Sequence, residues 1–273
     1  DHPLAVASPP HEPAVAELVE SADVLLAIGT DWDGQNTQQW RLDPRGTVIR
    51  VDLLASQLKI NLVPDIAVVA DARAFIDAVI DAVPSRRASL PAAHATVSEV
   101  RRAVAERITT DPRDTAGAAI VASLSAAIPE HVPVVADMTM VGYWASGYLS
   151  RRRPRTFMYP MGWGTLGYGL PLSVGVAHGS GSPTVAVVGD AGFLFAAGEL
   201  ATLAERQLPV IVLLFNDEAY GVLAYNLDEE HAQQMRGLQS PDFVALAQSF
   251  GIDAQRVEAS GLEDALPAAI SRG

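Results

Sequence analysis

The stretch TVAVVGDAG, residues 184–192, joins a short apolar run to a turn of small residues that carries one carboxylate, Asp190. The run PVIVLLF, residues 209–215, likewise leads directly into Asn216-Asp217. Short runs rich in valine, isoleucine and leucine are typical of buried strands in a parallel sheet. Because the carboxyl ends of parallel strands share one edge, where open α/β sheets bind ligands, we expect Asp190 and Asp217 to lie together at a binding site.

The residues around Asp190 indicate which ligand this edge would take. Gly189, Ala191 and Gly192 leave room for a phosphate to approach the backbone, and a helix is expected to begin directly after them. Two carboxylates beside a phosphate would repel it unless a hard cation lay between them, so the pattern predicts Mg²⁺ or Ca²⁺ together with a diphosphate. An aspartate after a strand is often only a helix N-cap, but two of them at this spacing favour the cation site.

Composition restricts the class of protein. The chain has 273 residues, 49% of them hydrophobic, which is enough for one large domain or two ordinary ones. A formal charge of −13 argues against nucleic acid as a partner, because no basic stripe is present to replace its counterions. The lack of cysteine excludes disulfides, thiolate metal sites and a cysteine nucleophile. With no signal peptide and no apolar segment of membrane-spanning length, we expect a cytoplasmic enzyme without a membrane partner.

Strands and helices alternate along the chain, which predicts an α/β fold of two doubly wound domains with mainly parallel sheets. The domains would span residues 1–83 and 95–273, with a proline- and serine-containing linker at 84–94. The expected strands are 24–28, 47–51, 66–70, 132–136, 184–188, 209–215 and 255–258. The expected helices are 14–21, 75–83, 115–128, 141–149, 241–250 and 262–270. Because the first domain offers only about three strands, we expect a part of a longer protein or one subunit of a split one.

Three segments together resemble the thiamine diphosphate-dependent enzymes: GWGTLGYGLP at 162–171, VAVVGDAGF at 185–193 and FNDEAYG at 215–221. More narrowly, they are similar to the branch that holds acetolactate synthase, pyruvate oxidase and benzoylformate decarboxylase. The family's signature is Gly-Asp-Gly followed by Asn-Asn, and here Ala191 and Asp217 replace the third glycine and the second asparagine. Alanine still fits a tight turn and aspartate is still an oxygen donor, so both changes keep the expected metal site.

The resemblance covers nearly the whole chain. Residues 1–83 are similar to the latter part of the family's central domain, and residues 95–273 to its diphosphate-binding domain, whereas its pyrimidine-binding domain has no counterpart. In the family, the glutamate that activates the cofactor lies on that third domain, so the resemblance implies no catalytic residue in this chain. It also implies a partner: a pyrimidine-binding domain from a missing segment or from another subunit of a homodimer or homotetramer.

The resemblance implies thiamine diphosphate and Mg²⁺ as cofactors, with a role for individual residues. The Mg²⁺ ligands would be the side chains of Asp190 and Asp217 and the carbonyl of Ala219. Leu166 would support the bent cofactor, and the Gly164 carbonyl would accept a hydrogen bond from its amino group. The diphosphate would be held by the amides of Ala191, Gly192, Tyr220 and Gly221. The full set of cofactor-binding residues would be Thr139, Met140, Val141, Gly164, Thr165, Leu166, Gly189, Asp190, Ala191, Gly192, Asp217, Ala219, Tyr220 and Gly221.

Val222 and Leu223 follow the last segment and indicate an apolar wall of the substrate pocket. Some relatives, such as pyruvate decarboxylase, carry an acidic side chain at the position of Leu223, and the chain is more similar to benzoylformate decarboxylase or acetolactate synthase. The resemblance implies an enzyme acting on a small 2-oxo acid, and we expect a non-oxidative decarboxylase, a lyase. An acetolactate synthase-like carboligase, a transferase, is the alternative.

An alternative of another class is a non-catalytic diphosphate-binding module or an inert fragment of a larger enzyme. Against the binding module, no Gly-x-Gly-x-x-Gly follows the first expected strand and no Walker lysine is present.

The segment after the first expected strand bears on flavin. Acetolactate synthases carry Gly-x-Arg-aromatic-x-Asp-Arg there, and its arginines contact FAD. Here residues 29–35 read GTDWDGQ, so both arginines are replaced and the segment contains two carboxylates, Asp31 and Asp33. These carboxylates would repel the flavin diphosphate, and we therefore expect no FAD. This favours the decarboxylase over the carboligase.

Overall fold

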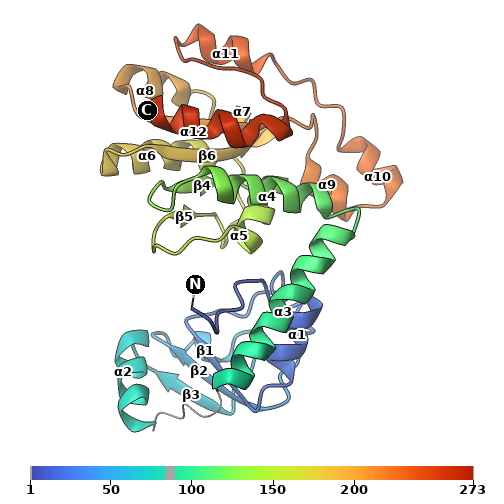
Figure 1. Ribbon diagram of the computed structural model, residues 1–273, viewed down its shortest axis with the longest axis vertical. Coiled ribbons are helices and arrows are strands. Elements are labelled where there is room, and N and C mark those ends of the chain that lie inside the picture. The colour runs from blue at the N-terminus through green and yellow to red at the C-terminus, as the bar shows by residue number, and fades with distance from the viewer. Residues whose placement is uncertain (1, 84–89, 273) are drawn as a thin grey trace. The chain divides into compact units, whose positions relative to one another are not determined.

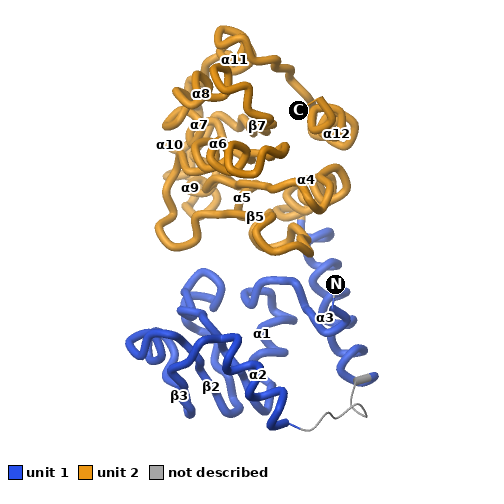
Figure 2. The backbone as a smooth tube through the Cα atoms, turned by 90° about the vertical axis from the view of Figure 1, so that its left-hand side faces the viewer, with its two compact units in different colours: residues 1–111 blue, residues 112–273 orange. Residues whose placement is uncertain are grey.

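The computed structural model describes residues 2–83 and 90–272. The chain forms two compact units, residues 1–111 and 112–273 (Figures 1 and 2). Of the expected linker at 84–94, residues 84–89 lie outside the described residues, and residues 90–94 begin a long helix. The first compact unit includes this helix, and the expected domain bounds, 1–83 and 95–273, stay predictions.

The first unit has a three-stranded parallel sheet whose strands follow chain order, β1-β2-β3. The elements are α1 (Pro13–Glu20), β1 (Val24–Ile28), β2 (Thr47–Asp52), η1 (Gln57–Lys59), β3 (Ile66–Val69), α2 (Ala72–Ala82) and α3 (Leu90–Thr110). Helix α3 packs beside α1, and Arg107 Nε donates to Glu12 Oε2 at 2.6 Å. Because Glu12 is almost fully buried, this ion pair fastens α3 to the first unit.

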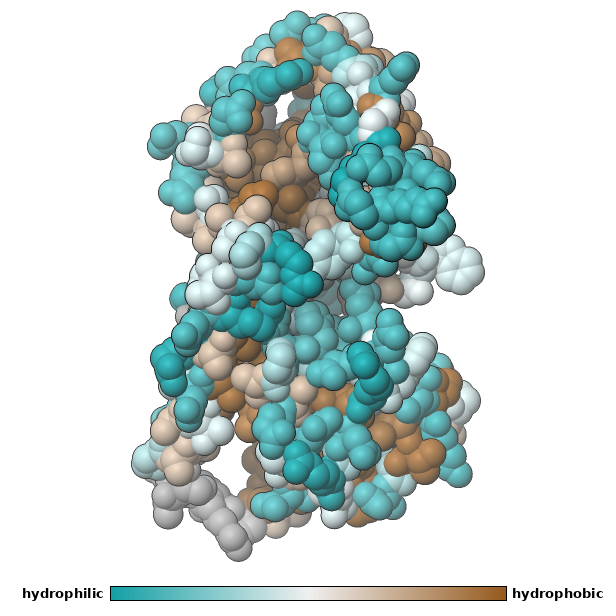
Figure 3. Space-filling model, turned by 90° about the vertical axis from the view of Figure 1, so that its right-hand side faces the viewer, coloured by the Kyte–Doolittle hydropathy of each residue, from teal (hydrophilic) through white to brown (hydrophobic). Residues whose placement is uncertain are grey.

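Apolar side chains of the first unit reach the surface, as the lower half of Figure 3 shows. Val24 and Leu26 of β1, Ile66 and Val69 of β3 and Ile80 of α2 are all exposed. The described part of this unit thus buries only some of its apolar surface.

The second unit has a four-stranded, entirely parallel sheet with the spatial order β5-β4-β6-β7. Its strands are β4 (Val134–Ala136), β5 (Phe157–Met158), β6 (Thr184–Gly189) and β7 (Val210–Phe215). Its helices are α4 (Thr115–Ala127), α5 (Met140–Tyr148), α6 (Gly169–Ser180), α7 (Asp190–Phe195), α8 (Glu199–Arg206), α9 (Gly221–Asn226), α10 (Glu229–Gln234), α11 (Phe243–Ser249), η3 (Ala259–Gly261) and α12 (Leu262–Arg272).

Helices cover both faces of this second sheet. On one face, Leu124 of α4 and Leu266 of α12 pack in a core with Val187 of β6. On the other face, Leu170 of α6 packs with Val188, the next residue of β6, because successive side chains of a strand point to opposite sides. The second unit is therefore doubly wound, and the α/β fold with parallel sheets is confirmed.

One expected strand is wrong. Residues 255–258 are an exposed, extended segment between α11 and α12, and within the described ranges β7 ends the sheet. A strand needs a neighbour that supplies hydrogen-bond partners, and here the segment does not pair with β7. Conversely, β5 was not expected, because its two residues are too short to show any alternation.

No helix in the described part of the chain is long and apolar enough to cross a membrane.

Candidate cofactor site

The strand order of the second unit creates a crevice between β4 and β6. From β4 the chain moves outward to β5, and then crosses back to β6 and on to β7. The loops that leave the carboxyl ends of β4 and β6 therefore run in opposite directions. Such a switch point is where open α/β sheets bind their ligands.

Segments far apart in sequence meet at this switch point. A Cβ atom on Gly189, at the end of β6, would lie 2.9 Å from Thr139 Oγ1, in the segment after β4. A Cβ on Gly221, at the start of α9, would lie 2.5 Å from Asp217 Oδ2 and 3.0 Å from Met140 Cγ. Side chains lie so close to these two glycines that a larger residue would have to displace them. The structure thus brings together the expected segments after β4, β6 and β7.

Asp190 and Asp217 form the electrostatic centre of the site. Asp190 is 1% exposed and begins α7; its Oδ1 accepts from the Ala191 amide at 2.8 Å and its Oδ2 from Ser240 Oγ at 3.2 Å. Part of Asp217 is open to solvent, yet desolvation of the rest and the nearby charge of Asp190 raise the pKa of Asp217. The two carboxylates therefore repel each other, as expected for a pair that would hold a cation.

These residues fit a divalent cation with a diphosphate, but they would not complete its ligand shell. In residues 2–83 and 90–272, no group of three or more His, Cys, Asp or Glu side chains could hold a metal ion. An octahedral Mg²⁺ between Asp190 and Asp217 would thus need a backbone carbonyl, phosphate oxygens or water. Ala219, whose carbonyl was expected to be a ligand, is buried and follows shortly after Asp217 in the sequence.

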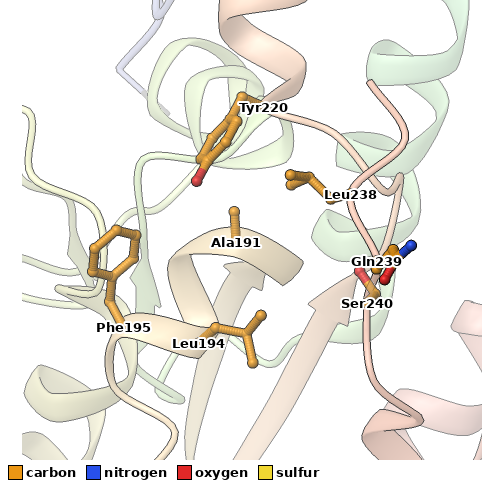
Figure 4. A pocket seen from close by; sticks show the side chains of 7 residues that line it. All are labelled: Ala191, Leu194, Phe195, Tyr220, Leu238, Gln239 and Ser240. Atoms are coloured by element: carbon orange, nitrogen blue, oxygen red, sulfur yellow. The ribbon is translucent and has the colours of Figure 1, made fainter. Parts of the chain in front are cut away.

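A pocket of about 270 Å³ opens beside Asp190 (Figure 4). The residues that line it are Ala191, Leu194, Phe195, Tyr220, Leu238, Gln239 and Ser240. Figure 4 shows the ring of Tyr220 reaching toward the space between Ala191 and Phe195. One wall comes from residues 238–240, a segment that the sequence did not indicate. It is held by the Leu238 amide, which donates to the Glu218 carbonyl at 2.8 Å.

Two of the four amides expected to hold a diphosphate already have protein partners. The Ala191 amide donates to Asp190, and the Tyr220 amide donates to the Met235 carbonyl at 2.8 Å. Gly192 is buried, and a Cβ there would lie 3.3 Å from Asp137 Oδ2. The roles of these amides, and that of Gly221, stay predictions.

The glycine-rich segment follows β5 and contains the residues expected under the cofactor. Gly164 has a left-handed backbone with a φ of 65°, Thr165 is exposed and Leu166 is half-buried. A half-buried leucine in a loop can contact a ligand, as the expected support of the cofactor requires. Val141 was also expected to bind the cofactor, and its side chain belongs to the core formed with α4 and α12.

The two expected substrate-pocket residues lie on α9. Val222 is half-buried, whereas Leu223 is 52% exposed. An apolar wall at this position stays a prediction.

Two residues of this region were missed as site residues. Asp137 is 1% exposed and accepts hydrogen bonds from the glycine-rich segment, and Ser240 donates to Asp190. Asp137 carried the same signal as Asp190, an aspartate directly after a strand. Ser240 carried none, since only the folded chain brings it to residue 190.

In the metal-free chain, we expect stability to fall as the pH rises through the raised pKa of Asp217. This pKa is higher in the folded state than the ordinary value of 3.8, so the folded state binds more protons between the two values. The free energy of unfolding then decreases as the pH increases through that window. Urea unfolding of the wild type and of Asp217→Asn from about pH 4 to 7 tests this. The free energy of unfolding of the wild type minus that of the variant should decrease as the pH rises. A difference that stays constant or increases contradicts the expectation.

The sequence matches known families over both units. Residues 137–273 match the family described as thiamine pyrophosphate enzyme, C-terminal TPP binding domain, and residues 1–79 match the thiamine pyrophosphate enzyme central domain. The chain belongs to the thiamine pyrophosphate enzyme family. The expected resemblance is thus confirmed. Membership in this thiamine pyrophosphate family implies thiamine diphosphate as the cofactor of the site.

Three relatives within the thiamine pyrophosphate enzymes illustrate the similarity. A probable 2-ketoarginine decarboxylase of Pseudomonas aeruginosa is 34% identical over 241 residues, which are 86% of this chain and 42% of the relative. The acetolactate synthase of Bacillus subtilis is 29% identical over 248 residues, 88% of this chain and 43% of that protein. A probable acetolactate synthase large subunit of Methanocaldococcus jannaschii is 26% identical over 275 residues, 94% of this chain and 46% of that subunit. The chain thus spans less than half the length of these relatives.

Proposed function

We propose that the chain forms the diphosphate-binding part of a thiamine diphosphate- and Mg²⁺-dependent enzyme that decarboxylates a 2-oxo acid without oxidation. The observation that carries this proposal is the mutually repelling pair of Asp190 and Asp217 at the switch point of a thiamine pyrophosphate enzyme domain. When bound, thiamine diphosphate supplies a nucleophilic carbon and an electron sink for the bond that breaks.

The protein's own contribution is binding, orientation and electrostatics. Asp190 and Asp217 would hold Mg²⁺, which neutralises them and anchors the diphosphate at the amino-terminal end of α7. Leu166 would support the cofactor from the glycine-rich segment, and the Gly164 carbonyl would orient its amino group. Val222 and Leu223 would exclude water from one side of the substrate.

The activating glutamate would come from a pyrimidine-binding domain, in another segment or in a second subunit of a dimer or tetramer. This arrangement is supported by the relatives, which are more than twice as long as the matched part.

The substrate proposal starts from two groups of relatives. The probable 2-ketoarginine decarboxylase supports a 2-oxo acid with a guanidino group as the first candidate. The acetolactate synthases support the second candidate function, in which two 2-oxo acids are joined with loss of one carbon dioxide. The segment at 29–35, in which Asp31 and Gln35 replace the arginines and Asp33 adds a second carboxylate, favours the decarboxylase, because a flavin-dependent carboligase would need positive charge there.

A substrate assay separates these functions. The enzyme assembled with its pyrimidine-binding domain, thiamine diphosphate and Mg²⁺ is given 2-ketoarginine, benzoylformate or pyruvate. We expect carbon dioxide and the corresponding aldehyde in equal amounts from one of the first two. Acetolactate from pyruvate as the main product would favour the carboligase. Cofactor binding without turnover of any 2-oxo acid would favour the non-catalytic binding module.

A further inference from the structure

Asp137 is a buried carboxylate at the carboxyl end of β4 to which no role has been given. It is 1% exposed, and both of its oxygens accept hydrogen bonds from backbone amides. Oδ2 accepts from Gly167 at 3.0 Å and from Gly169 at 3.1 Å, and Oδ1 accepts from Met138 at 2.7 Å. Because leaving a buried amide or carboxylate without a partner is costly, these bonds fix the glycine-rich segment to β4.

The first turn of α6 depends on this carboxylate. Gly169 is the first residue of α6, and the residue before it, Tyr168, provides no side-chain cap. Asp137 therefore acts as the cap from a neighbouring strand, with its negative charge at the positive end of a helix of 12 residues. A cap that comes from another element fixes where the helix begins as well as whether it forms.

Helices α5, α6 and α7 each place a glycine against Asp137. A Cβ on Gly142 of α5 would overlap the Asp137 carbonyl oxygen. A Cβ on Gly169 would lie 3.0 Å from Asp137 Cβ, and one on Gly192 of α7 would lie 3.3 Å from Oδ2. The three helices thus pack closely against Asp137: α5 against its carbonyl, α6 against its Cβ and α7 against its carboxylate.

The neighbouring residue, Met138, lies close to the other end of the glycine-rich segment. A Cβ on Gly164 would touch the Met138 methyl group at 3.4 Å, and the Met138 sulfur accepts from Tyr159 Oη at 2.9 Å. Burial, Tyr143 and Asp137 all raise the pKa of Tyr159, so this hydroxyl keeps its proton and remains a donor. Residues 165 and 166 therefore lie between Gly164, which is close to Met138, and Gly167, which is bonded to Asp137.

We propose that Asp137 is a positioning residue. It fixes where Leu166 and the Gly164 carbonyl lie relative to the carboxylates of Asp190 and Asp217. The inference rests on the proposed function, because these two groups are the expected contacts to the cofactor. Residues 137–140 also contact Gly189 and Gly221 through Thr139 and Met140. One short segment thus fixes the glycine-rich loop and the metal-binding turns relative to each other.

The test is Asp137→Asn in the assembled holoenzyme. Asparagine keeps the shape but replaces one acceptor oxygen by a donor, and every acceptor of Asp137 faces an amide. We expect kcat to fall about 10- to 100-fold, the range found when a supporting partner of a site is lost. The Mg²⁺ concentration at half-saturation should change less than about threefold, because Asp190 and Asp217 are untouched. The near-ultraviolet circular dichroism of the bound cofactor should change, since its amino group loses its fixed acceptor.

The matched control is Asp71→Asn in the first unit. Asp71 also accepts from two amides at a helix start, Arg73 at 3.0 Å and Ala74 at 3.1 Å. The Asp71→Asn substitution should leave kcat and the circular dichroism of the bound cofactor unchanged. An Asp137→Asn enzyme within threefold of the wild-type kcat and with unchanged circular dichroism would overturn the proposal, as would a large loss of Mg²⁺ affinity.

Amide hydrogen exchange makes the test independent of catalysis. If Asp137 anchors the loop, the amides of Gly167 and Gly169 exchange at least about tenfold faster in Asp137→Asn, while those of β6 do not. Unchanged exchange would overturn the proposal. A wild type that does not bind thiamine diphosphate would instead refute the proposed function, and the exchange result would still decide whether Asp137 holds the loop.

Discussion

Asp190→Asn is expected to remove Mg²⁺-dependent binding of thiamine diphosphate and to lower activity at least about 100-fold. The change keeps the local structure, because an asparagine oxygen can still accept from the Ala191 amide and its nitrogen can donate to Ser240 Oγ. Only the negative charge is lost. Since Asp190 and Asp217 repel each other without a cation, the metal-free variant should be at least as stable as the wild type.

Thermal or urea unfolding with and without ligand measures this effect. A ligand at 100 times its dissociation constant stabilises a folded protein by about 2.7 kcal/mol. The wild type should gain about this much from Mg²⁺ with thiamine diphosphate, and Asp190→Asn should gain almost nothing. Glu205→Gln on the exposed side of α8 is the control, and it should behave as the wild type. A variant that keeps the full ligand-dependent gain would refute the assignment of Asp190 as a metal ligand.

Gly142→Ala is expected to destabilise the second unit by about 1–3 kcal/mol, the cost of inserting a methylene-sized group into a packed interior. Alanine normally favours a helix over glycine, so the sign is opposite to that of helix propensity. It is reversed here because the new Cβ would overlap the Asp137 carbonyl oxygen. Helix α5 would have to move away from β4.

Gly175→Ala in α6 provides the matched control, because no atom lies within 4 Å of a Cβ at that position. It should stabilise the same unit by about 0.5–1 kcal/mol. Denaturant-dependent amide exchange of β4 and β6 reports the second unit alone. Equal effects of the two substitutions would show that the approach of α5 to Asp137 is not as close as the structure has it.

Strands β6 and β7 could be predicted from the sequence because each is a long uninterrupted apolar run that ends in small or acidic residues. The pairing of Asp190 with Asp217 followed from that, since both lie at carboxyl ends of adjacent parallel strands. The closeness of these two carboxylates could therefore be predicted from local sequence and a general rule of sheet geometry.

Other parts of the site depend on contacts that no local pattern contains. Asp137 meets Gly167 and Gly169 across the switch point, and Ser240 reaches Asp190 from a loop beyond α10. The prediction of a strand at 255–258 was wrong for a related reason. Its residues are compatible with a strand, but a strand also needs a second segment to pair with, and this cannot be read from the segment itself. Helix α3 was not predicted because Pro91 lies near its start and a proline- and serine-containing segment precedes it. Its attachment depends on the buried Glu12, which is far away in the sequence.

The position of β7 at the end of the sheet has a consequence for handling the protein. All six residues of β7 are apolar and only partly buried, and in the described chain its backbone pairs with β6 alone. A row of free amides and carbonyls beside apolar side chains is a template to which another strand can add. Strand addition at β7 is therefore one route by which the isolated chain can self-associate, and a short polar strand that paired there would act as a solubilising cap.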